Sequence, residues 1–416
     1  MLAVLAVALP AFGAGRNTKI LHTFPGSPDG SNPAAGLVAD SAGNLYGTTE
    51  GGGVFGHGTV FELSPVNYGN GWFYQVIYNF QGQFDGNLPR GGVILDKAGN
   101  LYGTTLIGGA HGVGTVFQLS PAQGGGWRET VIHDFGAGSD GVEPSSSLVF
   151  DNLGNLYGTA SSGGGVGTCV ASGCGIVFKL SPKSGGQWKE TVLYAFTGGL
   201  DGELPFSGVA VDARRHVFGT TNFGDRTLCN GEGCGLVYEL AHTPSGWKQT
   251  VIYNFIGGND GASPSAAPIL DSAGNLYGVT GLGGSAGGGV VYKLSPSRNG
   301  WQETVIHAFS GLDGVDPQGS LVFDSVGNLY GTTEFGGNLM RCGGGCGTIF
   351  ELSPNGAGGW DESTVRRFVN GKDGVLPLGS VAVDAAGNVY ATTSNGGVVN
   401  GGFGAGTVVK VKPPLP

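Results

Sequence analysis

The chain has 416 residues, of which 86 are glycine and 12% are charged, and its formal net charge is −10. So few charges argue against long solvated helices, while 40% hydrophobic residues with regularly spaced aromatics argue against a disordered chain. An acidic chain without a basic stripe also argues against a nucleic-acid partner and against adhesion to an anionic membrane surface.

The first residues have the pattern of a secretory signal peptide, an apolar run followed by small residues. Ala11 and Gly13 occupy positions suited to cleavage, although the positively charged opening segment is missing and would need a start further upstream. We therefore expect residues 1–15 to be a signal peptide and residues 16–416 to be one secreted or periplasmic domain. No other segment reaches the roughly 18 apolar residues of a transmembrane helix, and no C-terminal anchor is visible.

A D-x-x-G-N-L-Y-G-T-T motif then recurs in seven copies, spaced 53 to 61 residues apart. The copies begin at Asp40, Asp96, Asp151, Asp212, Asp271, Asp324 and Asp384. The fourth copy is degenerate, because Arg214, Arg215 and His216 occupy its turn. That break indicates either a functional site or drift. Self-similarity at this period predicts a repeat architecture rather than several separate domains.

Each copy contains four short strand candidates separated by turns. A D-G-x-x-P turn precedes the motif, a G-T-V-F-E-L-type strand follows it, and a W-x-E-T-V-I-Y-x-F segment comes after the first six copies of that strand. In the first copy the expected strands are Gly36–Asp40, Asn44–Thr49, Gly58–Leu63 and Tyr74–Phe80. Seven such units predict an all-β fold, a seven-bladed β-propeller of four-stranded blades. A β-solenoid is the alternative, but its rungs are usually about half this long.

Two features favour a closed ring over a solenoid. A small residue stands four positions before each motif aspartate, as suits an innermost strand where blades crowd the axis. These residues are Gly36, Gly92, Ser147, Gly208, Ala267, Ser320 and Ser380. The last copy also ends at Thr407–Val411 without a fourth strand, and a matching segment, Lys19–Phe24, lies near the N-terminus. We expect that segment to complete the last blade and to leave no open sheet edge.

The D-x-x-G-N-L-Y-G-T-T and G-T-V-F-x-L-S-P strings resemble the GloVer tandem-repeat family of secreted bacterial proteins, over nearly all of the chain after residue 17. The resemblance implies an exported repeat protein with no established activity to transfer. Members of that family carry C-terminal anchors of varying type, and this chain departs from them by showing none. The D-x-x-G-N pattern is more loosely similar to NHL-type domains and streptogramin lyases, which implies the propeller fold alone.

Blade geometry is expected to place the D-G-x-x-P connections and the loops between second and third strands on one face. Those loops vary from 8 to 14 residues, and variable loops on a constant scaffold are typical of recognition sites. The residues that mix aromatic, amide and charged groups there are Asn222, Phe223, Asp225, Arg226, Glu334, Phe335, Met340 and Arg341. They predict a surface that binds a glycan or a protein; the alternative is that these are plain solvated loops.

All six cysteines lie in these loops as close pairs: Cys169/Cys174, Cys229/Cys234 and Cys342/Cys346. Close pairing in an exported chain predicts three local disulfides, although pairing between copies stays open. A zinc site made by the four cysteines of the third and fourth copies is the alternative, but it leaves the last pair without partners. We therefore predict no metal site.

The catalytic signals are weaker. His57 and His111 lie in short loops on the presumed functional face, and Glu50 or Asp225 would be their carboxylate partners in a lyase or glycosidase. Histidines that replace a fourth-strand tyrosine are expected to be structural: His22, His133 and His307. The seven D-G-x-x-P aspartates are expected to cap turns. A structural calcium ion among them is conceivable but nothing in the sequence supports it, so no cofactor is predicted.

These patterns favour a monomeric extracellular scaffold that binds a glycan or a protein. The alternative is a secreted propeller enzyme, a lyase or glycosidase with its site near the axis. An enzyme should have a deep central pocket with asymmetric polar groups and a perturbed pKa, whereas a binding module should present a shallow face with aromatic side chains.

Overall fold

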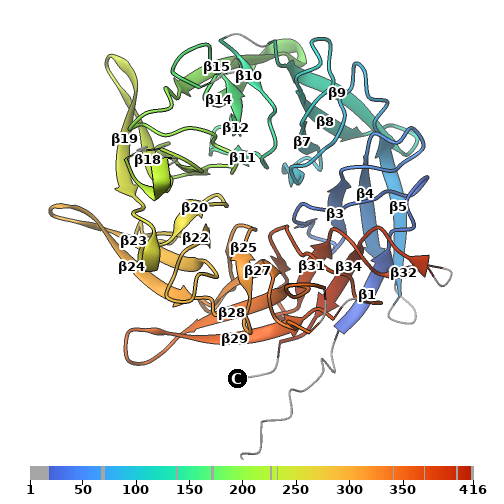
Figure 1. Ribbon diagram of the computed structural model, residues 1–416. Coiled ribbons are helices and arrows are strands. Elements are labelled where there is room, and N and C mark those ends of the chain that lie inside the picture. The colour runs from blue at the N-terminus through green and yellow to red at the C-terminus, as the bar shows by residue number, and fades with distance from the viewer. Residues whose placement is uncertain are drawn as a thin grey trace, which may run out of the picture.

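Figure 1 shows the chain closed into a ring of seven sheets around a central axis. This computed structural model describes residues 18–66, 71–136, 139–169, 173–224, 227–231, 233–340, 342–369, 371–399 and 402–413. Within these ranges the helices are the short 3-10 turns η1 (Ser184–Gly186), η2 (Cys229–Gly231) and η3 (Gly258–Asp260), none of which has the length or apolar character to cross a membrane. The predicted seven-bladed, all-β propeller is confirmed.

Each blade is an antiparallel sheet that runs from a two-residue strand at the axis to a longer strand at the outer edge. From the axis outward, the first blade has β2 (Val38–Ala39), β3 (Leu45–Thr49), β4 (Thr59–Pro65) and β5 (Trp72–Asn79); the second has β6 (Ile94–Leu95), β7 (Leu101–Thr105), β8 (Thr115–Pro121) and β9 (Trp127–Asp134); and the third has β11 (Val149–Phe150), β12 (Leu156–Ala160), β14 (Ile176–Pro182) and β15 (Trp188–Ala195). The fourth has β16 (Ala210–Val211), β17 (Val217–Thr221), β18 (Leu236–Thr243) and β19 (Gly246–Asn254), and the fifth has β21 (Ile269–Leu270), β22 (Leu276–Leu282), β23 (Val290–Ser297) and β24 (Gly300–Ala308). The sixth has β26 (Val322–Phe323), β27 (Leu329–Phe335), β28 (Thr348–Pro354) and β29 (Trp360–Arg367), and the seventh has β30 (Ala382–Val383), β31 (Val389–Thr393), β34 (Thr407–Val411) and β1 (Thr18–Thr23).

Short additional strands lie in the connections. Three pairings join a D-G-x-x-P connection to the segment at the end of a second strand. They are β10 (Gly141–Val142) with β13 (Ser162–Gly163), β20 (Ala262–Pro264) with β22, and β25 (Val315–Pro317) with β27. A further hairpin, β32 (Val398–Val399) with β33 (Gly402–Phe403), lies in the last long loop.

The N-terminal strand completes the last blade, as predicted. β1 pairs antiparallel with β34, and beyond it the Phe24 N–H donates to the Gly406 carbonyl at 2.9 Å. The ring is also joined near the axis, where the Thr392 hydroxyl donates to the Ala35 carbonyl at 2.7 Å. Equivalent hydroxyl bonds join other neighbouring blades, for example from Thr48 to the Gly91 carbonyl at 3.1 Å. The boundary between the last and first blades is therefore built like the others.

The second glycine of the D-x-x-G-N-L-Y-G-T-T motif makes room for an aromatic side chain on the third strand in the first six blades. A Cβ atom on Gly47 would lie 2.6 Å from the Phe61 ring, and the other motif glycines of the first six blades have the same relation to a phenylalanine or tyrosine. The seventh blade changes both members together, since Ala391 lies opposite Val409. The smaller valine leaves space for the alanine methyl group.

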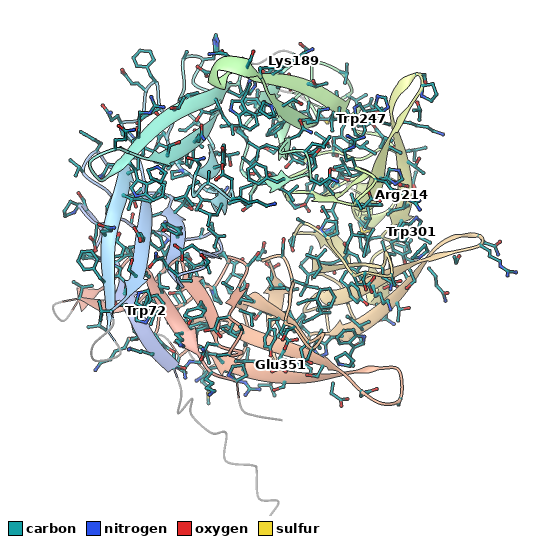
Figure 2. All side chains as sticks on the ribbon, turned by 180° about the vertical axis from the view of Figure 1, so that it is seen from behind. Trp72, Lys189, Arg214, Trp247, Trp301 and Glu351 are labelled. Atoms are coloured by element: carbon teal, nitrogen blue, oxygen red, sulfur yellow. A yellow bond between two sulfur atoms is a disulfide. The ribbon has the colours of Figure 1, made fainter. Side chains whose placement is uncertain are left out.

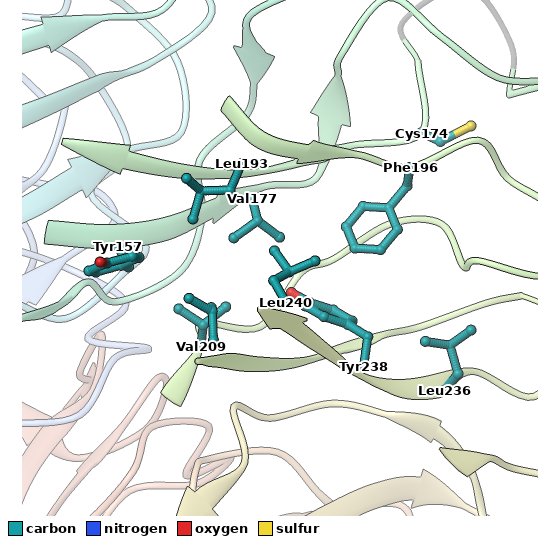
Figure 3. Close-up of a cluster of buried hydrophobic side chains, with 10 residues drawn as sticks. Tyr157, Cys174, Val177, Leu193, Phe196, Val209, Leu236, Tyr238 and Leu240 are labelled. Carbon is teal, nitrogen blue, oxygen red and sulfur yellow. The ribbon is translucent and has the colours of Figure 1, made fainter. Parts of the chain in front are cut away.

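Hydrophobic clusters fill the spaces between neighbouring blades. Figure 3 shows the cluster between the third and fourth blades, where Val177 and Phe196 meet Leu236 and Tyr238. The Phe196 and Tyr238 rings are 5.2 Å apart in an edge-on arrangement. Because both faces of each sheet are covered in this way, the first five residues of every second strand are buried.

The aspartate of each D-G-x-x-P turn bonds a fourth-strand side chain. Tyr78 donates to Asp85 at 2.9 Å, and His22 and His307 make the same contact with their aspartates at 2.9 Å. His133 lies 3.5 Å from Asp140, so the structural role expected for the three histidines is confirmed. Backbone N–H groups of the turn also donate to these carboxylates, as at Gly136 and Asp140 (2.9 Å), which confirms the turn-capping role.

Candidate functional site

Two kinds of connection lie together on one face of the ring, as the sequence predicted. Backbone bridges join D-G-x-x-P connections to the loops after second strands: Ser31 to Gly51, Asn87 to Ile107, Glu203 to Phe223 and Val375 to Asn395. We call this side the loop face. The opposite side, formed by the turns after the first and third strands, is the hairpin face.

The residue before each connection proline has a left-handed backbone. The φ angle lies between 54° and 60° at Asn32, Leu88, Glu143, Leu204, Ser263, Asp316 and Leu376. Residues other than glycine seldom adopt this conformation. Each of these seven N–H groups donates to a carbonyl of the preceding blade, at 2.8 to 3.1 Å. The turn therefore carries the chain from the outer edge of one blade to the axis of the next, and fixes the position of the residue after the proline.

A pocket of about 580 Å³ occupies the axis of the ring. The small residues predicted to crowd the axis line it in all seven blades: Gly36, Gly92, Ser147, Gly208, Ala267, Ser320 and Ser380. Their short side chains leave the centre open. The sequence thus determines a pocket wall that is nearly the same in every blade.

The residue after each connection proline lines the loop-face end of this pocket and is of six kinds in the seven copies. These rim residues are Ala34, Arg90, Ser145, Phe206, Ser265, Gln318 and Leu378. The Arg90 Nε donates to Glu50 at 2.9 Å, and the Phe206 side chain is 42% exposed. A cation, an aromatic ring, an amide and an aliphatic group therefore surround one opening, and the rim has no sevenfold symmetry.

Two carboxylates lie next to each other at the sixth blade. The pairing of β25 with β27 places Asp316 opposite Glu334, and the Gln318 amide donates to Asp316 Oδ1 at 2.8 Å. Burial raises the pKa of Asp316 to about 6, which the Gln318 hydrogen bond opposes. Burial, with the charge of Asp316 adding to it, also raises the pKa of Glu334. The pair lies beside the rim residue Gln318 without lining the central pocket, and it has raised pKa values of the kind found in enzyme sites.

The structure divides the predicted binding residues between the fourth and sixth blades. Asn222 and Glu334 occupy the position of Glu50, directly after the second-strand threonines. The backbones of Phe223 and Phe335 are held by D-G-x-x-P connections, and Met340 is 95% exposed. Three further predicted residues lie outside the described part of the chain: Asp225, Arg226 and Arg341. The predicted set is thus not one continuous patch.

The histidines proposed as catalytic bases lie away from their proposed partner. Glu50 binds Arg90, and no hydrogen bond or ion pair joins it to His57 among the described residues. The His57 ring packs against Gly82, where a Cβ atom would come within 2.5 Å, and His111 lies near the equivalent Gly136. Catalytic roles for these histidines stay predictions, and the structure gives them no shared site with Glu50.

The three predicted disulfides are confirmed, each closing a loop between second and third strands: Cys169–Cys174, Cys229–Cys234 and Cys342–Cys346. The carbonyls of the three second cysteines accept the left-handed N–H groups described above, so each bridge anchors its loop to the next blade. Glu203 lies 2.8 Å from the Cys169 sulfur. Within the described ranges, Cys169, Cys174 and Glu203 are the three ligand-type groups near enough to share a metal ion, but the two sulfurs form the disulfide.

The rim residues were not identified from the sequence, although a signal for them exists. In every copy a D-G-x-x-P turn precedes the rim position and two residues later comes the small axial residue, so the variable position stands between constant neighbours. The same alignment identifies Asp316, because it stands at the variable position directly before the proline of its copy.

Comparison with known proteins gives a family and a fold. The family model described as the Gloeobacter/Verrucomicrobia repeat matches residues 11–232 and 216–414. No curated protein matches the chain. The extracellular domain of a candidate one-component system from B. thetaiotaomicron is 12% identical with a TM-score of 0.53, over 94% of this chain and 40% of that one. A protein of unknown function from Dyadobacter fermentans is 11% identical with a TM-score of 0.48, over 96% and 100% of the two chains. At such low identity these likenesses concern the fold alone.

Proposed function

The chain belongs to the Gloeobacter/Verrucomicrobia repeat family, and from this premise we propose that it is an extracellular binding scaffold that takes a glycan or a protein segment at the loop-face end of its central pocket. The observation that carries this proposal is the rim. The small axial residues repeat around the ring, whereas the rim position holds a different chemical group in nearly every blade. Binding residues concentrate where a constant scaffold presents variable positions.

The disulfides support the proposed extracellular location. Three local disulfides with no free cysteine among the described residues are consistent with an oxidising compartment outside the cytoplasm. Loops closed by disulfides on a ring also suit recognition, because less conformational entropy is lost when a constrained surface binds. An exposed aromatic such as Phe206 and a guanidinium such as Arg90 on one rim are the kinds of group that carry binding energy.

The test is to incubate the chain with a panel of polysaccharides and cell-wall polymers, and to read bound protein and released products from the same samples. We expect retention on at least one polymer, and we expect Arg90→Ala and Phe206→Ala each to weaken it by about tenfold, the effect of losing roughly 1.4 kcal/mol. Phe73→Ala and Arg298→Ala are the controls, because both side chains lie away from the pocket. Equal weakening by rim and control variants would contradict a binding role for the rim.

An enzymatic role is the second candidate, and the raised pKa of Asp316 beside Glu334 is what favours it. Two carboxylates with perturbed pKa values are the usual equipment of glycoside hydrolysis. If the same samples release product, Asp316→Asn should abolish the release while retention of the protein persists. Product that survives in both Asp316→Asn and Glu334→Gln would rule out this pair as the catalytic acid and base.

A further inference from the structure

Two departures of the fourth copy from the repeat pattern, at Arg215 and at His242, lie together on the hairpin face. Arg215 has a φ of 67° at a turn position that is glycine in the six other copies, with φ between 74° and 96°. His242 stands at the end of the third strand, where the other copies have proline. In the first blade that proline packs 3.9 Å from the Cβ position of the turn glycine. The fourth blade has lost this contact and has a pocket in its place.

The pocket lies between the third and fourth blades and has a volume of about 250 Å³. The third blade contributes Lys179 and Tyr157, and the fourth contributes Arg214, Arg215, His242 and Trp247. Figure 2 shows Arg214 and Trp247 close together on the fourth blade, in a view from behind Figure 1.

The tryptophan at this pocket has different neighbours from the tryptophans at other blade boundaries. At five boundaries the outer-strand tryptophan packs edge-on against a second-strand tyrosine or phenylalanine, with centroids 5.9 to 6.2 Å apart. At this boundary the Trp247 centroid lies 6.0 Å from Lys179 Nζ and 5.4 Å from the His242 ring. Trp247 therefore lines the pocket together with the cationic side chains of Lys179, Arg214 and Arg215.

The three cationic side chains are not neutralised by the protein. Lys179, Arg214 and Arg215 form no ion pair with any carboxylate in the part of the chain that the structure describes. Asp151 is near, but its oxygens accept from Asn155, from Tyr157 and from backbone N–H groups. In a chain with a net charge of −10, three unpaired cations around one small pocket are an exception. Arg215 also keeps a strained conformation that glycine would relieve, and such strain clusters at functional sites.

We propose that this pocket binds an acidic sugar residue of a polysaccharide through its carboxylate. Arginine side chains match carboxylate geometry in a fork, and lysine adds a point charge. Trp247 and His242 offer ring surfaces against which the apolar face of one sugar unit can lie. The volume is below the ~300 Å³ at which drug-sized pockets begin, so it suits a single sugar unit. The site is on the face opposite the rim residues, so it goes beyond the function proposed above and does not depend on it.

The test uses the full chain with trigalacturonic acid as the probe and an uncharged trisaccharide of similar length as the comparison, measured by calorimetry and by the change in tryptophan fluorescence that Trp247→Phe should remove. We expect binding of the acidic probe alone, weakened at least tenfold by Lys179→Ala and by the pair Arg214→Ala with Arg215→Gly. Binding should also weaken between low and high salt, because the contacts are charge-assisted. Arg215→Gly restores the residue of the other six turns, so the thermal midpoint of the variant should be no lower than that of the parent chain.

Lys293→Ala is the matched control, because Lys293 occupies the position of Lys179 in the fifth blade and lies 5.5 Å from a tyrosine centroid without arginines beside it. This variant should bind like the parent chain. The proposal is overturned if the parent chain does not bind the acidic probe at millimolar concentration, if it binds the uncharged probe equally, or if Lys293→Ala weakens binding as much as Lys179→Ala. Full competition by inorganic sulfate at equal concentration would instead make this a bare oxyanion site, and would overturn the assignment to a sugar.

Discussion

Replacing Phe24 with alanine should lower the free energy of unfolding by about 3–5 kcal/mol, the usual range for a fully buried phenylalanine. The Phe24 ring is completely buried in the cluster that joins the last blade to the first, with the Phe61 and Tyr74 ring centroids 5.2 and 5.7 Å away. Its removal leaves a cavity at the boundary where the ring closes. Urea unfolding followed by tryptophan fluorescence measures the effect.

Phe80→Ala is the matched control, because Phe80 follows the outer strand of the first blade as Phe24 follows β1. Its ring is equally buried and lies 5.1 Å from Phe117. The two variants should lose similar stability if the N-terminal strand truly completes the seventh blade. A much smaller loss for Phe24→Ala than for Phe80→Ala would mean that the closing strand contributes little, and would contradict the closed ring.

The second large effect concerns two half-buried glutamates on outer strands. Glu129 and Glu303 occupy the position of Tyr74 and Gln249, which donate to the backbone carbonyl of the preceding D-G-x-x-P aspartate at 3.0 and 3.3 Å. A glutamate can donate there only when it is protonated. Each of the two has a buried Oε1 without a hydrogen-bond partner among the described residues. Burial raises the pKa of both to about 7, and the charge of a nearby aspartate adds to the effect.

The stability of the ring should therefore fall as the pH rises from about 4.5 to 7. A carboxyl group whose pKa is raised on folding contributes stability that is complete below its unfolded pKa and is lost as the pH passes its folded pKa. With allowance for solvent screening, each glutamate should contribute on the order of 1 kcal/mol. Glu129→Gln combined with Glu303→Gln keeps the donor at every pH and should flatten the dependence. Urea midpoints at pH 4.5, 6 and 7.5 test this.

The converse substitution is the control. Gln249→Glu places an ionisable group at the same position of the fourth blade and should add to the loss of stability between pH 4.5 and 7. An unchanged slope in the double glutamine variant, together with an unchanged slope in Gln249→Glu, would show that these positions do not govern the pH dependence.

The fold was predictable because its determinants are local. Turn aspartates such as Asp40 accept the backbone N–H groups of Ala42 and Asn44 at 2.9 Å, so the motif itself builds each first hairpin. The cysteine pairs are four or five residues apart, and their pairing needed no knowledge of the ring. Strand ends were less accurate, because the innermost strand keeps only Val38–Ala39 as a ladder while its other groups face the axis.

The candidate site was much less predictable, because it is assembled from residues 53 to 61 positions apart. The rim residues meet only once seven blades close, and each is unremarkable in its own copy. Residues outside their own loop also decide where Glu50 and His57 lie, and their catalytic roles stay predictions. Both belong to one loop, but Glu50 turns toward Arg90 of the next blade, and His57 packs on Gly82. Arg215 was visible as a break in the repeat, whereas its partners Lys179 and His242 gave no signal before the strands were aligned.

The closing strand also constrains the order in which the protein can fold. β1 is made well before β34, and the hydroxyl bond from Thr392 to Ala35 spans 357 residues. Contacts of such sequence separation form late, because a long loop must be closed before they contribute. During synthesis, β1 is therefore expected to remain an unpaired strand edge while the intervening blades assemble, and in this interval the chain is expected to be most exposed to aggregation.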